Sequence, residues 1–351
     1  MRNDDPADTS EDPPRWTIAL PTFNGARHLN ETLDGVLKQC RQGPAFELVI
    51  CDDGSTDDTV LLARRRLADS GLTIHWEIHE RPLGLAGNWN RCLARARTPL
   101  LTILHQDDLP RPGYVFGADR HHRDDPSLAM TFSSVELIDE ASQPIPPTTL
   151  APPDLGALSK RFEAGEFNHI LAVENPVRCS SVTLKRMAML EIGGFDERLK
   201  YAVDWECWAR LSRRYPVLWR PEATVAVRWH RRSATWSFKT GLADLEEVAM
   251  ITRQILEEDG KNWTSSERRQ IAARARRDLA SSYLNRAYDA ACAGRPDLTR
   301  RAFAQATRLD PATPLKVAAQ PRLLGRLALG LTGRVPNQAS GLTRTRPMDE
   351  N

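Results

Sequence analysis

The feature that most constrains this chain is an apolar run at residues 101–104 that leads into His-Gln-Asp-Asp at residues 105–108. A short apolar run bounded by a polar turn is typical of a buried strand, usually one of a parallel sheet. In open α/β sheets, ligands bind outside the carboxyl ends of the strands, so Asp107 and Asp108 fall where a site is expected. Two adjacent carboxylates repel each other unless they share a positive partner, and a divalent cation is the simplest such partner. The alternative is that both acids only begin the turn before Pro110.

The same arrangement occurs earlier, where a second apolar run ends in Asp52 and Asp53. Predicted strands are residues 16–20, 46–51, 72–78, 101–104, 128–132, 177–184, 217–219 and 224–230, and predicted helices are residues 29–37, 58–68, 85–95, 111–123, 185–192 and 204–214. Their alternation implies right-handed crossovers and a mostly parallel sheet, and therefore an α/β fold. We expect Asn24 or Asn30 to cap the first helix and Asp57 to cap the second.

Composition places the chain among ordinary globular proteins and excludes several other classes. Of 351 residues, 41% are hydrophobic and 27% are charged, and the net charge of +2 is too small to argue for a nucleic-acid partner. The six cysteines have no C-x-x-C spacing, so we expect reduced thiols in a cytosolic protein. Residues 1–15 are rich in Asp and Pro and are predicted to form a disordered tail. No apolar run is long enough to span a bilayer, so any membrane contact is expected to be peripheral.

Five segments in a fixed order carry a family resemblance. They are Pro21-Thr22-Phe23-Asn24, Asp52-Asp53-Gly54-Ser55-Thr56-Asp57, Leu104-His105-Gln106-Asp107-Asp108, Gly193-Gly194-Phe195-Asp196, and Asp204 at the start of its helix. Each is common alone, but in this order and at these separations they resemble glycosyltransferase family 2, over residues 16–235. The resemblance implies a GT-A domain over residues 16–238, Rossmann-like with a mostly parallel sheet flanked by helices, followed by an all-α region.

The resemblance implies that the loops after the strands hold a nucleoside-diphosphate sugar, linked to uridine or thymidine. Asp52 is implied to contact the base, with Asp53 nearby, because a carboxylate accepts strong charge-assisted hydrogen bonds from base N–H and ribose hydroxyl groups. Thr22 and Asn24 are expected to line the same pocket. The residues implied to bind the nucleotide sugar are Pro21, Thr22, Phe23, Asn24, Asp52, Asp53, Asp107 and Asp108, with Arg81 and Asn88 at the rim.

The family's D-x-D element corresponds here to His105-Gln106-Asp107, so a histidine stands in place of the first acid. Asp107 is implied to bind a Mn²⁺ or Mg²⁺ ion that bridges the donor's phosphates, and Asp108 either supports that ligand from behind or is an alternative ligand. Imidazole is a poor ligand for Mg²⁺ but suits Mn²⁺, so His105 either shifts the metal preference or only donates a hydrogen bond. His230, which ends a late strand, is expected to supply another metal-binding nitrogen or a phosphate contact.

Asp204 resembles the family's catalytic base. Inverting sugar transfer requires the acceptor hydroxyl to lose its proton as its oxygen attacks the anomeric carbon, and a positioned carboxylate performs this role. The alternative is that Asp204 is only the N-cap of its helix, a position at which Asp is common.

The chain is predicted to be helical beyond the first domain, over residues 239–334. Residues 277–311 match a tetratricopeptide-like helical hairpin, and one copy cannot form a solenoid, so the hairpin is expected to pack on a neighbour. The apolar residues 323–331, beside Arg322 and Arg334, are expected either to lie on an anionic membrane surface or to form a docking helix. Residues 335–351 are predicted to be a disordered tail.

Together these features predict an inverting, metal-dependent glycosyltransferase that transfers a sugar to a hydroxyl of a glycan or lipid-linked acceptor in cell-surface polysaccharide synthesis. The expected location is the cytoplasm, including the inner face of the membrane. The acceptor is expected to depend on loops such as Pro144 to Pro153, which carries five prolines. The alternative is a non-catalytic nucleotide-sugar-binding or scaffold protein that acts through its helical region. A nucleotidyltransferase is disfavoured because residues 21–25 do not form a Gly-rich phosphate loop.

Overall fold

The computed structural model of the chain describes residues 13–40, 45–146, 155–230, 238 and 240–331. The chain forms two compact units, which we describe separately. The first unit comprises residues 1–167 and 176–231, and the second comprises residues 168–175 and 232–351. The short segment 168–175 therefore belongs with the helical unit, which the sequence does not predict.

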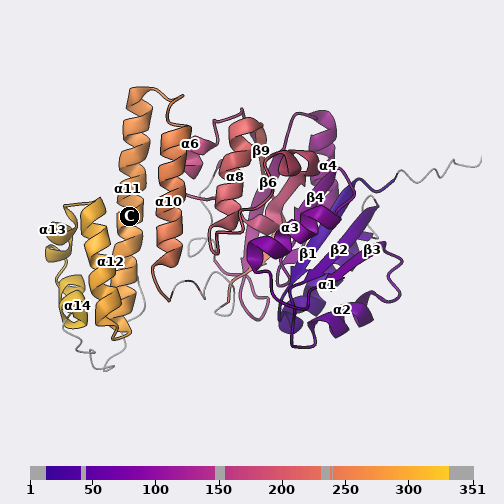
Figure 1. Cartoon of the computed structure of the whole chain (residues 1–351), viewed down its shortest axis with the longest axis horizontal. Coiled ribbons are helices and arrows are strands. Elements are labelled where there is room, and N and C mark those ends of the chain that lie inside the picture. Colours follow the sequence, from indigo (N-terminus) through magenta and orange to yellow (C-terminus); the bar gives the residue numbers. More distant parts are fainter. Residues whose placement is uncertain (1–12, 41–44, 147–154, 231–237, 239, 332–351) are drawn as a thin grey trace, which may run out of the picture. The chain divides into compact units, whose positions relative to one another are not determined.

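A single mixed sheet forms the centre of the first unit (Figure 1). Within the described residues its strands are β1 (Trp16–Thr22), β2 (Phe46–Asp52), β3 (Ile74–Ile78), β4 (Leu100–Ile103), β5 (Leu109–Pro110), β6 (Met130–Ile138), β7 (Lys160–Phe162), β8 (Val182–Lys185) and β9 (Val217–Arg228). Their order is β3-β2-β1-β4-β8-β6-β9-β5, with β7 paired to β9. Strands β1 to β4 are parallel, β8 is antiparallel to β4 and β6, and β6 is parallel to β9. The predicted α/β fold is confirmed, and the antiparallel pairs lie in the second half of the sheet.

Helices pack on this sheet, and their packing is the reason that its strands are apolar. They are α1 (Ala26–Cys40), α2 (Thr59–Leu67), α3 (Leu85–Arg95), α4 (Tyr114–Asp124), α7 (Arg186–Glu191) and α8 (Val203–Arg214). Every residue of β1 and β2 is buried, as expected for strands covered on both faces. Helix α3 packs on β1, β2 and β4 (Figure 1). The main apolar cluster joins strands and helices through Trp16, Ile18, Leu33, Val36, Leu48, Ile50 and Val115.

The parallel register brings three loops to one edge of the sheet. Thr22 is paired with Asp52 across β1 and β2, and Ala19 is paired with Ile103 across β1 and β4. The loops that follow these strands therefore begin at nearly the same height. This places the Pro21–Asn24, Asp52–Asp57 and His105–Asp108 segments next to one another, as the sequence predicts.

Several predicted elements differ from the structure. The strand predicted at residues 128–132 is β6, which continues to Ile138, and the short strands β5 and β7 were not predicted. The predicted strands 217–219 and 224–230 are one strand, β9, because Pro221 and Glu222 form a bulge opposite Ser133 and Ser134 of β6. A bulge accommodates a proline without removing a ladder hydrogen bond, so the turn signal at Pro221 does not end the strand. The strand predicted at residues 177–184 begins only at Val182, after a 3₁₀ turn over Cys179–Ser181.

The second unit is helical. Its described helices are α6 (Asn168–Leu171), α10 (Ala243–Glu258), α11 (Ser265–Cys292), α12 (Pro296–Leu309), α13 (Thr313–Ala318) and α14 (Pro321–Leu331). Helix α11 begins well before the predicted residue 277, because Thr264 and Glu267 form a reciprocal capping box. A reversal at Gly294, with φ of 65°, leads into α12, which packs along α11. A helical hairpin is thus present, and its assignment to the tetratricopeptide repeats remains a prediction.

Helix α14 buries its apolar face inside this unit. Leu323 and Leu327 belong to the core formed with α11 and α12. A Cβ on Gly330 would lie 2.3 Å from the Cβ of Ala291 in α11, so the two helices approach closely at this point. This is the packing expected of a docking helix, whereas membrane binding remains a prediction. No helix among the described residues is long and apolar enough to cross a membrane.

Several predictions fall on residues outside the described ranges. These are most of the N-terminal tail, the tail 335–351, residues 147–153 of the proline-rich loop, and the end of the first domain at residues 231–237. The six cysteines are free thiols, as predicted.

Candidate functional site

Asp52 connects the loops that follow β1 and β2. Its carboxylate accepts hydrogen bonds from Thr22 Oγ1 at 2.7 Å, from the Ser55 amide at 2.8 Å and from Ser55 Oγ at 2.6 Å. The side chain is buried. Asp52 therefore joins Thr22, after β1, to Ser55, in the loop after β2. These bonds hold the carboxylate in one orientation.

Asp53 and Asn88 fasten helix α3 to the end of β2. Asp53 accepts from the backbone amides of Leu83 and Gly84, at 2.6 and 3.0 Å, at the amino end of α3, where a negative charge also interacts favourably with the helix dipole. Asn88 donates from Nδ2 to the carbonyl of Cys51 at 3.0 Å and is buried. Of the two residues predicted at the rim of the pocket, Asn88 is thus buried between α3 and β2, whereas Arg81 is exposed.

Asp57 caps the first helix, and the predicted caps Asn24 and Asn30 do not. The amide of Ala26, the first residue of α1, donates to Asp57 Oδ2 at 3.2 Å. The N-cap position of α2 is Asp58, without a side-chain cap bond, and not the predicted Asp57, although Asp57 does accept from the amide of Thr59, the first residue of α2, at 3.0 Å. Burial raises the pKa of Asp57, but the bonds from Thr59 and Ala26 outweigh it and hold the pKa below its ordinary value. Asn24 instead accepts from the Thr56 amide at 2.9 Å, with a φ of 47°.

Gln106 joins the loop after β1 to the loop after β4, a role that the sequence analysis missed. Its side chain accepts from the Phe23 amide and donates to the Phe23 carbonyl, both at 2.9 Å. A Cβ at Gly25 would lie 2.1 Å from Gln106 Oε1, so only glycine leaves room for this bridge. The Phe23 side chain stays about half exposed.

Asp107 lies at the centre of the site. Its Oδ2 atom is 2.8 Å from Nε2 of His230, which a strand on the other side of the sheet delivers. Burial raises the pKa of Asp107, but the His230 hydrogen bond and the charges of His105 and His230 outweigh it, so the pKa lies below its ordinary value. The carboxylate is therefore ionised at neutral pH and available to a cation. The sequence predicted that Asp107, His105 and His230 act together. The structure places Asp107 beside each of the two histidines, but His105 and His230 fall in different groups of candidate ligands.

Asp108 is buried and supports its neighbours. It accepts from Ser180 Oγ at 2.5 Å and from the Arg228 amide at 2.9 Å. Burial, and then the charge of Asp107, raise the pKa of Asp108 to about 8. A carboxyl group with this pKa is mostly protonated at pH 7, so Asp108 differs from Asp107 in charge although the two are adjacent.

His105 fits a metal site better than a purely structural role. One ligand atom from each of His105, Asp107 and Asp108 lies within 4.8 Å of the others. Among the described residues, His105 Nε2 is one of the buried nitrogens that have no hydrogen-bond partner. Burial lowers the pKa of His105, while the charges of Asp107 and Asp204 raise it, and the net shift is downward. A neutral imidazole beside an ionised carboxylate is a ligand set that suits Mn²⁺.

Asp204 is not the N-cap of α8. That position is Ala202, which has no side-chain cap bond, and Asp204 is the second residue of the helix. Its carboxylate accepts from the Trp205 amide at 2.7 Å. The charge of Asp204 acts to raise the pKa of His105. Asp204, near the start of α8, therefore shares an electrostatic environment with the loop His105–Asp108 after β4.

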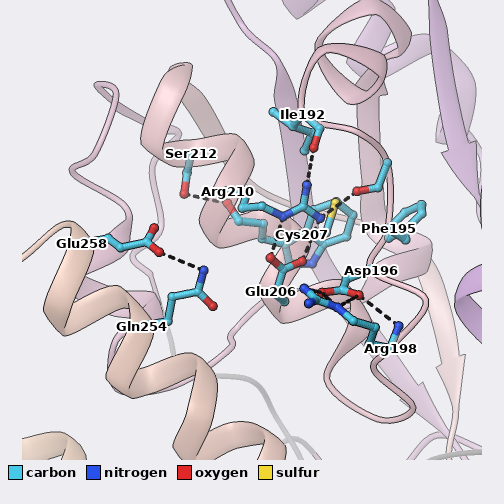
Figure 2. Close-up of polar contacts among 12 residues, drawn as sticks. Ile192, Phe195, Asp196, Arg198, Glu206, Cys207, Arg210, Ser212, Gln254 and Glu258 are labelled. Carbon is cyan, nitrogen blue, oxygen red and sulfur yellow. Dashed lines mark hydrogen bonds and ion pairs between the residues drawn. The ribbon is translucent and has the colours of Figure 1, made fainter.

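An arginine clamp positions the helix that carries Asp204 (Figure 2). Arg210 donates to both oxygens of Glu206, at 2.5 and 2.7 Å, and to the carbonyls of Ile192 and Gly194. From the other side, Asn90 of α3 bonds both the amide and the carbonyl of Phe195, at 2.8 and 2.9 Å. The Gly193–Asp196 turn is thus held between α3 and α8. Glu206 is fully engaged by Arg210.

Replacing Arg210 with methionine is expected to lower the free energy of unfolding by about 2 to 3 kcal/mol. The change removes four hydrogen bonds and leaves the buried Glu206 carboxylate without its partner, and an unpaired buried charge is costly. Urea unfolding followed by circular dichroism measures the loss. The double variant Glu206→Gln, Arg210→Met serves as the control and should recover part of the stability. Equal stabilities of the parent and Arg210→Met would show that the clamp contributes nothing.

Arg228 is a second organising residue that the sequence analysis did not identify. Its side chain is fully buried and donates to the carbonyl of Asp107 at 2.9 Å, to Ser142 Oγ at 2.9 Å and to Glu31 at 3.1 Å. Arg228 therefore connects β9 with the loop His105–Asp108, with the turn after β6 and with α1. Arginine near the end of a strand was visible in the sequence, but nothing local indicated its partners.

Comparisons with known proteins show which family the chain is similar to. The family model Glycosyl transferase family 2 matches residues 17–140. An uncharacterized protein of Mycobacterium tuberculosis, MT1568, is 30% identical over 62% of this chain and 67% of its own length. An uncharacterized glycosyltransferase of Rickettsia typhi, RT0329, is 24% identical over 68% of this chain and 70% of its own length.

Solved structures show the same fold. Residues 1–349 of TarS from Staphylococcus aureus, in complex with UDP, superpose with a TM-score of 0.60 and 14% identity, covering 86% of this chain and 92% of that chain. The mannosyltransferase PcManGT from Pyrobaculum calidifontis, in complex with GDP-Man and Mn²⁺, has a TM-score of 0.54 and 18% identity, covering 94% and 90%. The first unit therefore has the predicted GT-A architecture. The family model covers the first three of the five motifs, and the chain belongs to glycosyltransferase family 2.

Proposed function

We propose that this protein is an inverting glycosyltransferase that uses a uridine or thymidine diphosphate sugar as donor. The acceptor is a hydroxyl group of a glycan or lipid-linked molecule, used in cell-surface polysaccharide synthesis at the inner face of the membrane. The observation that carries the proposal is the position of Asp204, whose charge acts on His105 beside the ionised Asp107. A base and a cation-binding carboxylate thus stand in one environment, as sugar transfer from a diphosphate requires.

The proposed division of labour follows from the contacts of each carboxylate. Asp52 and Asp53 hold the loops that would receive the base and ribose, and Thr22 orients Asp52. Asp107, with His105 and His230 beside it, would hold the divalent ion, which when bound neutralises the charge that grows on the diphosphate. Asp108, protonated and bonded to Ser180, keeps the loop in place.

Asp204 is the proposed general base. The acceptor hydroxyl transfers its proton to the Asp204 carboxylate while its oxygen attacks the anomeric carbon. The bond from that carbon to the diphosphate oxygen breaks on the opposite face, so the configuration at the carbon inverts. The other acid of the helix, Glu206, is neutralised by Arg210 and is therefore a poor candidate for the same role.

Donor hydrolysis tests this proposal without requiring knowledge of the acceptor. The purified protein is incubated with UDP-glucose, UDP-N-acetylglucosamine, dTDP-glucose and GDP-mannose, each with Mn²⁺, with Mg²⁺ or with chelator. We expect slow release of the diphosphate from uridine or thymidine donors, and none with chelator. Release from GDP-mannose alone would contradict the nucleotide assignment. Tight donor binding with no release, and no transfer to any glycan acceptor, would favour a nucleotide-sugar-binding protein without turnover.

A further inference from the structure

Three side chains beside the loop after β4 form a group of candidate metal ligands, and the proposed sugar transfer uses only one of them, His230. They are His28 of α1, Glu140 in the turn after β6, and His230 after β9. One ligand atom from each lies within 4.8 Å of the other two. The His28 and His230 rings are in contact, with centroids 5.3 Å apart and their planes inclined at 55°. Three elements distant in sequence thus converge on one point.

Each imidazole in this group has a buried nitrogen without a hydrogen-bond partner. Among the described residues, Nε2 of His28 and Nδ1 of His230 are both in this state. The His28 residue is 7% exposed and the His230 side chain is also 7% exposed, so water does not readily compensate either nitrogen. A buried polar atom without a partner costs roughly 1–3 kcal/mol, so two side by side call for a specific cause.

We propose that His28, His230 and Glu140 form a binding site for a transition metal such as Zn²⁺, separate from the ion expected on the donor diphosphate. Two imidazole nitrogens and one carboxylate oxygen are a known Zn²⁺ ligand set, and imidazole disfavours Mg²⁺. Zn–N bonds of about 2.0–2.1 Å in tetrahedral geometry place ligand atoms roughly 3.3 Å apart, so side-chain rotation has to close the group slightly.

Asp107 is the partner that orients His230 in this site. A metal-binding histidine usually directs its other ring nitrogen to a carboxylate, and His230 Nε2 is 2.8 Å from Asp107 Oδ2. That hydrogen bond leaves Nδ1 of His230 as the ligand atom. The proposed metal would therefore fix the imidazole that contacts Asp107, although its binding does not depend on whether the protein transfers sugar.

Two arginines lie near the group and do not prevent binding. Arg27 pairs with Glu140 at 2.5 Å, but both side chains are about half exposed, and such a surface pair contributes only about 0–1 kcal/mol. Arg228 pairs with Glu31 at 3.1 Å and bonds Ser142 and backbone carbonyls. Burial, and then the charge of Arg228, lower the pKa of His28. The same Arg228 contacts hold α1, the turn after β6 and the end of β9 together without a metal.

Metal titration of the nucleotide-free protein tests the inference. Full-length protein without a histidine tag is stripped with chelator and titrated with Zn²⁺ by calorimetry, and with Co²⁺ by visible absorption. We expect one Zn²⁺ to bind at this group, with the strong absorption of tetrahedral Co²⁺, and no comparable binding of Mg²⁺. His28→Gln and Glu140→Gln should each weaken Zn²⁺ binding by about 10- to 100-fold or more.

The matched control is His121→Gln, which removes an imidazole of α4 that belongs to neither candidate group and should leave this Zn²⁺ affinity unchanged. Glu140 is exposed, so Glu140→Gln reports on the site even if His28→Gln destabilises the fold. Equal Zn²⁺ affinity in the parent, His28→Gln and Glu140→Gln would overturn the inference, as would the absence of Zn²⁺ binding. Because no donor is present, neither result depends on sugar transfer.

Discussion

Replacing Asp204 with asparagine is expected to lower the rate of sugar transfer by about 10² to 10⁴ while donor affinity stays nearly unchanged. Positioned proton transfer contributes this much to catalysis, and asparagine cannot accept the proton of the acceptor hydroxyl. The substitution is close to isosteric, and Asp204 is the second residue of α8 and not its cap, so the helix should remain intact. Transfer kinetics with the identified donor and acceptor, together with calorimetric donor binding, measure the two quantities separately.

The control for this experiment is Asp69→Asn, which changes an exposed carboxylate after α2 and should affect neither quantity. Thermal unfolding of both variants shows whether the fold is preserved. If Asp204→Asn transfers sugar at the parent rate, Asp204 is not the base. If both donor affinity and rate fall in parallel with stability, its role is structural.

Replacing Asp107 with asparagine is expected to reduce metal-dependent turnover by about 100-fold or more. A bound ion supplies several kcal/mol of charge stabilisation on the leaving group, and each 1.4 kcal/mol corresponds to tenfold in rate. Asparagine can retain a hydrogen bond with His230, but it lacks the charge that holds the ion. Donor binding measured with Mn²⁺ and with chelator should differ in the parent and become equal in the variant.

Two comparisons sharpen this test. Asp124→Asn removes an exposed carboxylate of α4 and should leave the Mn²⁺ dependence unchanged. His105→Asp restores an acid at the position where the family's D-x-D element has one, and a rise in Mg²⁺ activity relative to Mn²⁺ would indicate that His105 is a ligand. Survival of full activity in Asp107→Asn with excess chelator would show that a cationic side chain, and not a metal, neutralises the leaving group.

The sequence by itself determined the elements whose patterns are local. Strands β1, β2 and β4 lie where buried runs that end at turn residues predict them, within two residues of the predicted bounds 16–20, 46–51 and 101–104. Helix α3 occupies residues 85–95 as predicted, because Gly84 begins it. The position of Asp57 before α2 also follows from its local spacing. Such features depend on a few neighbouring residues, so hydrophobic periodicity and turn chemistry are sufficient to predict them.

Only the tertiary structure decided which side chains meet across the sheet edge. The Asp57 cap of α1, the Gln106 bridge to Phe23 and the continuation of β9 past Pro221 all depend on partners in other loops. The pairing of His230 with Asp107 and the approach of His28 to His230 depend on the strand order, which places the end of β9 beside the loop after β4. Strand order and register are set by packing of the whole apolar core, and no local pattern encodes them. The sequence therefore determined which acids lie at the edge of the sheet, and the fold determined that the pKa of Asp107 is lowered beside His230 while burial raises the pKa of Asp108 to about 8.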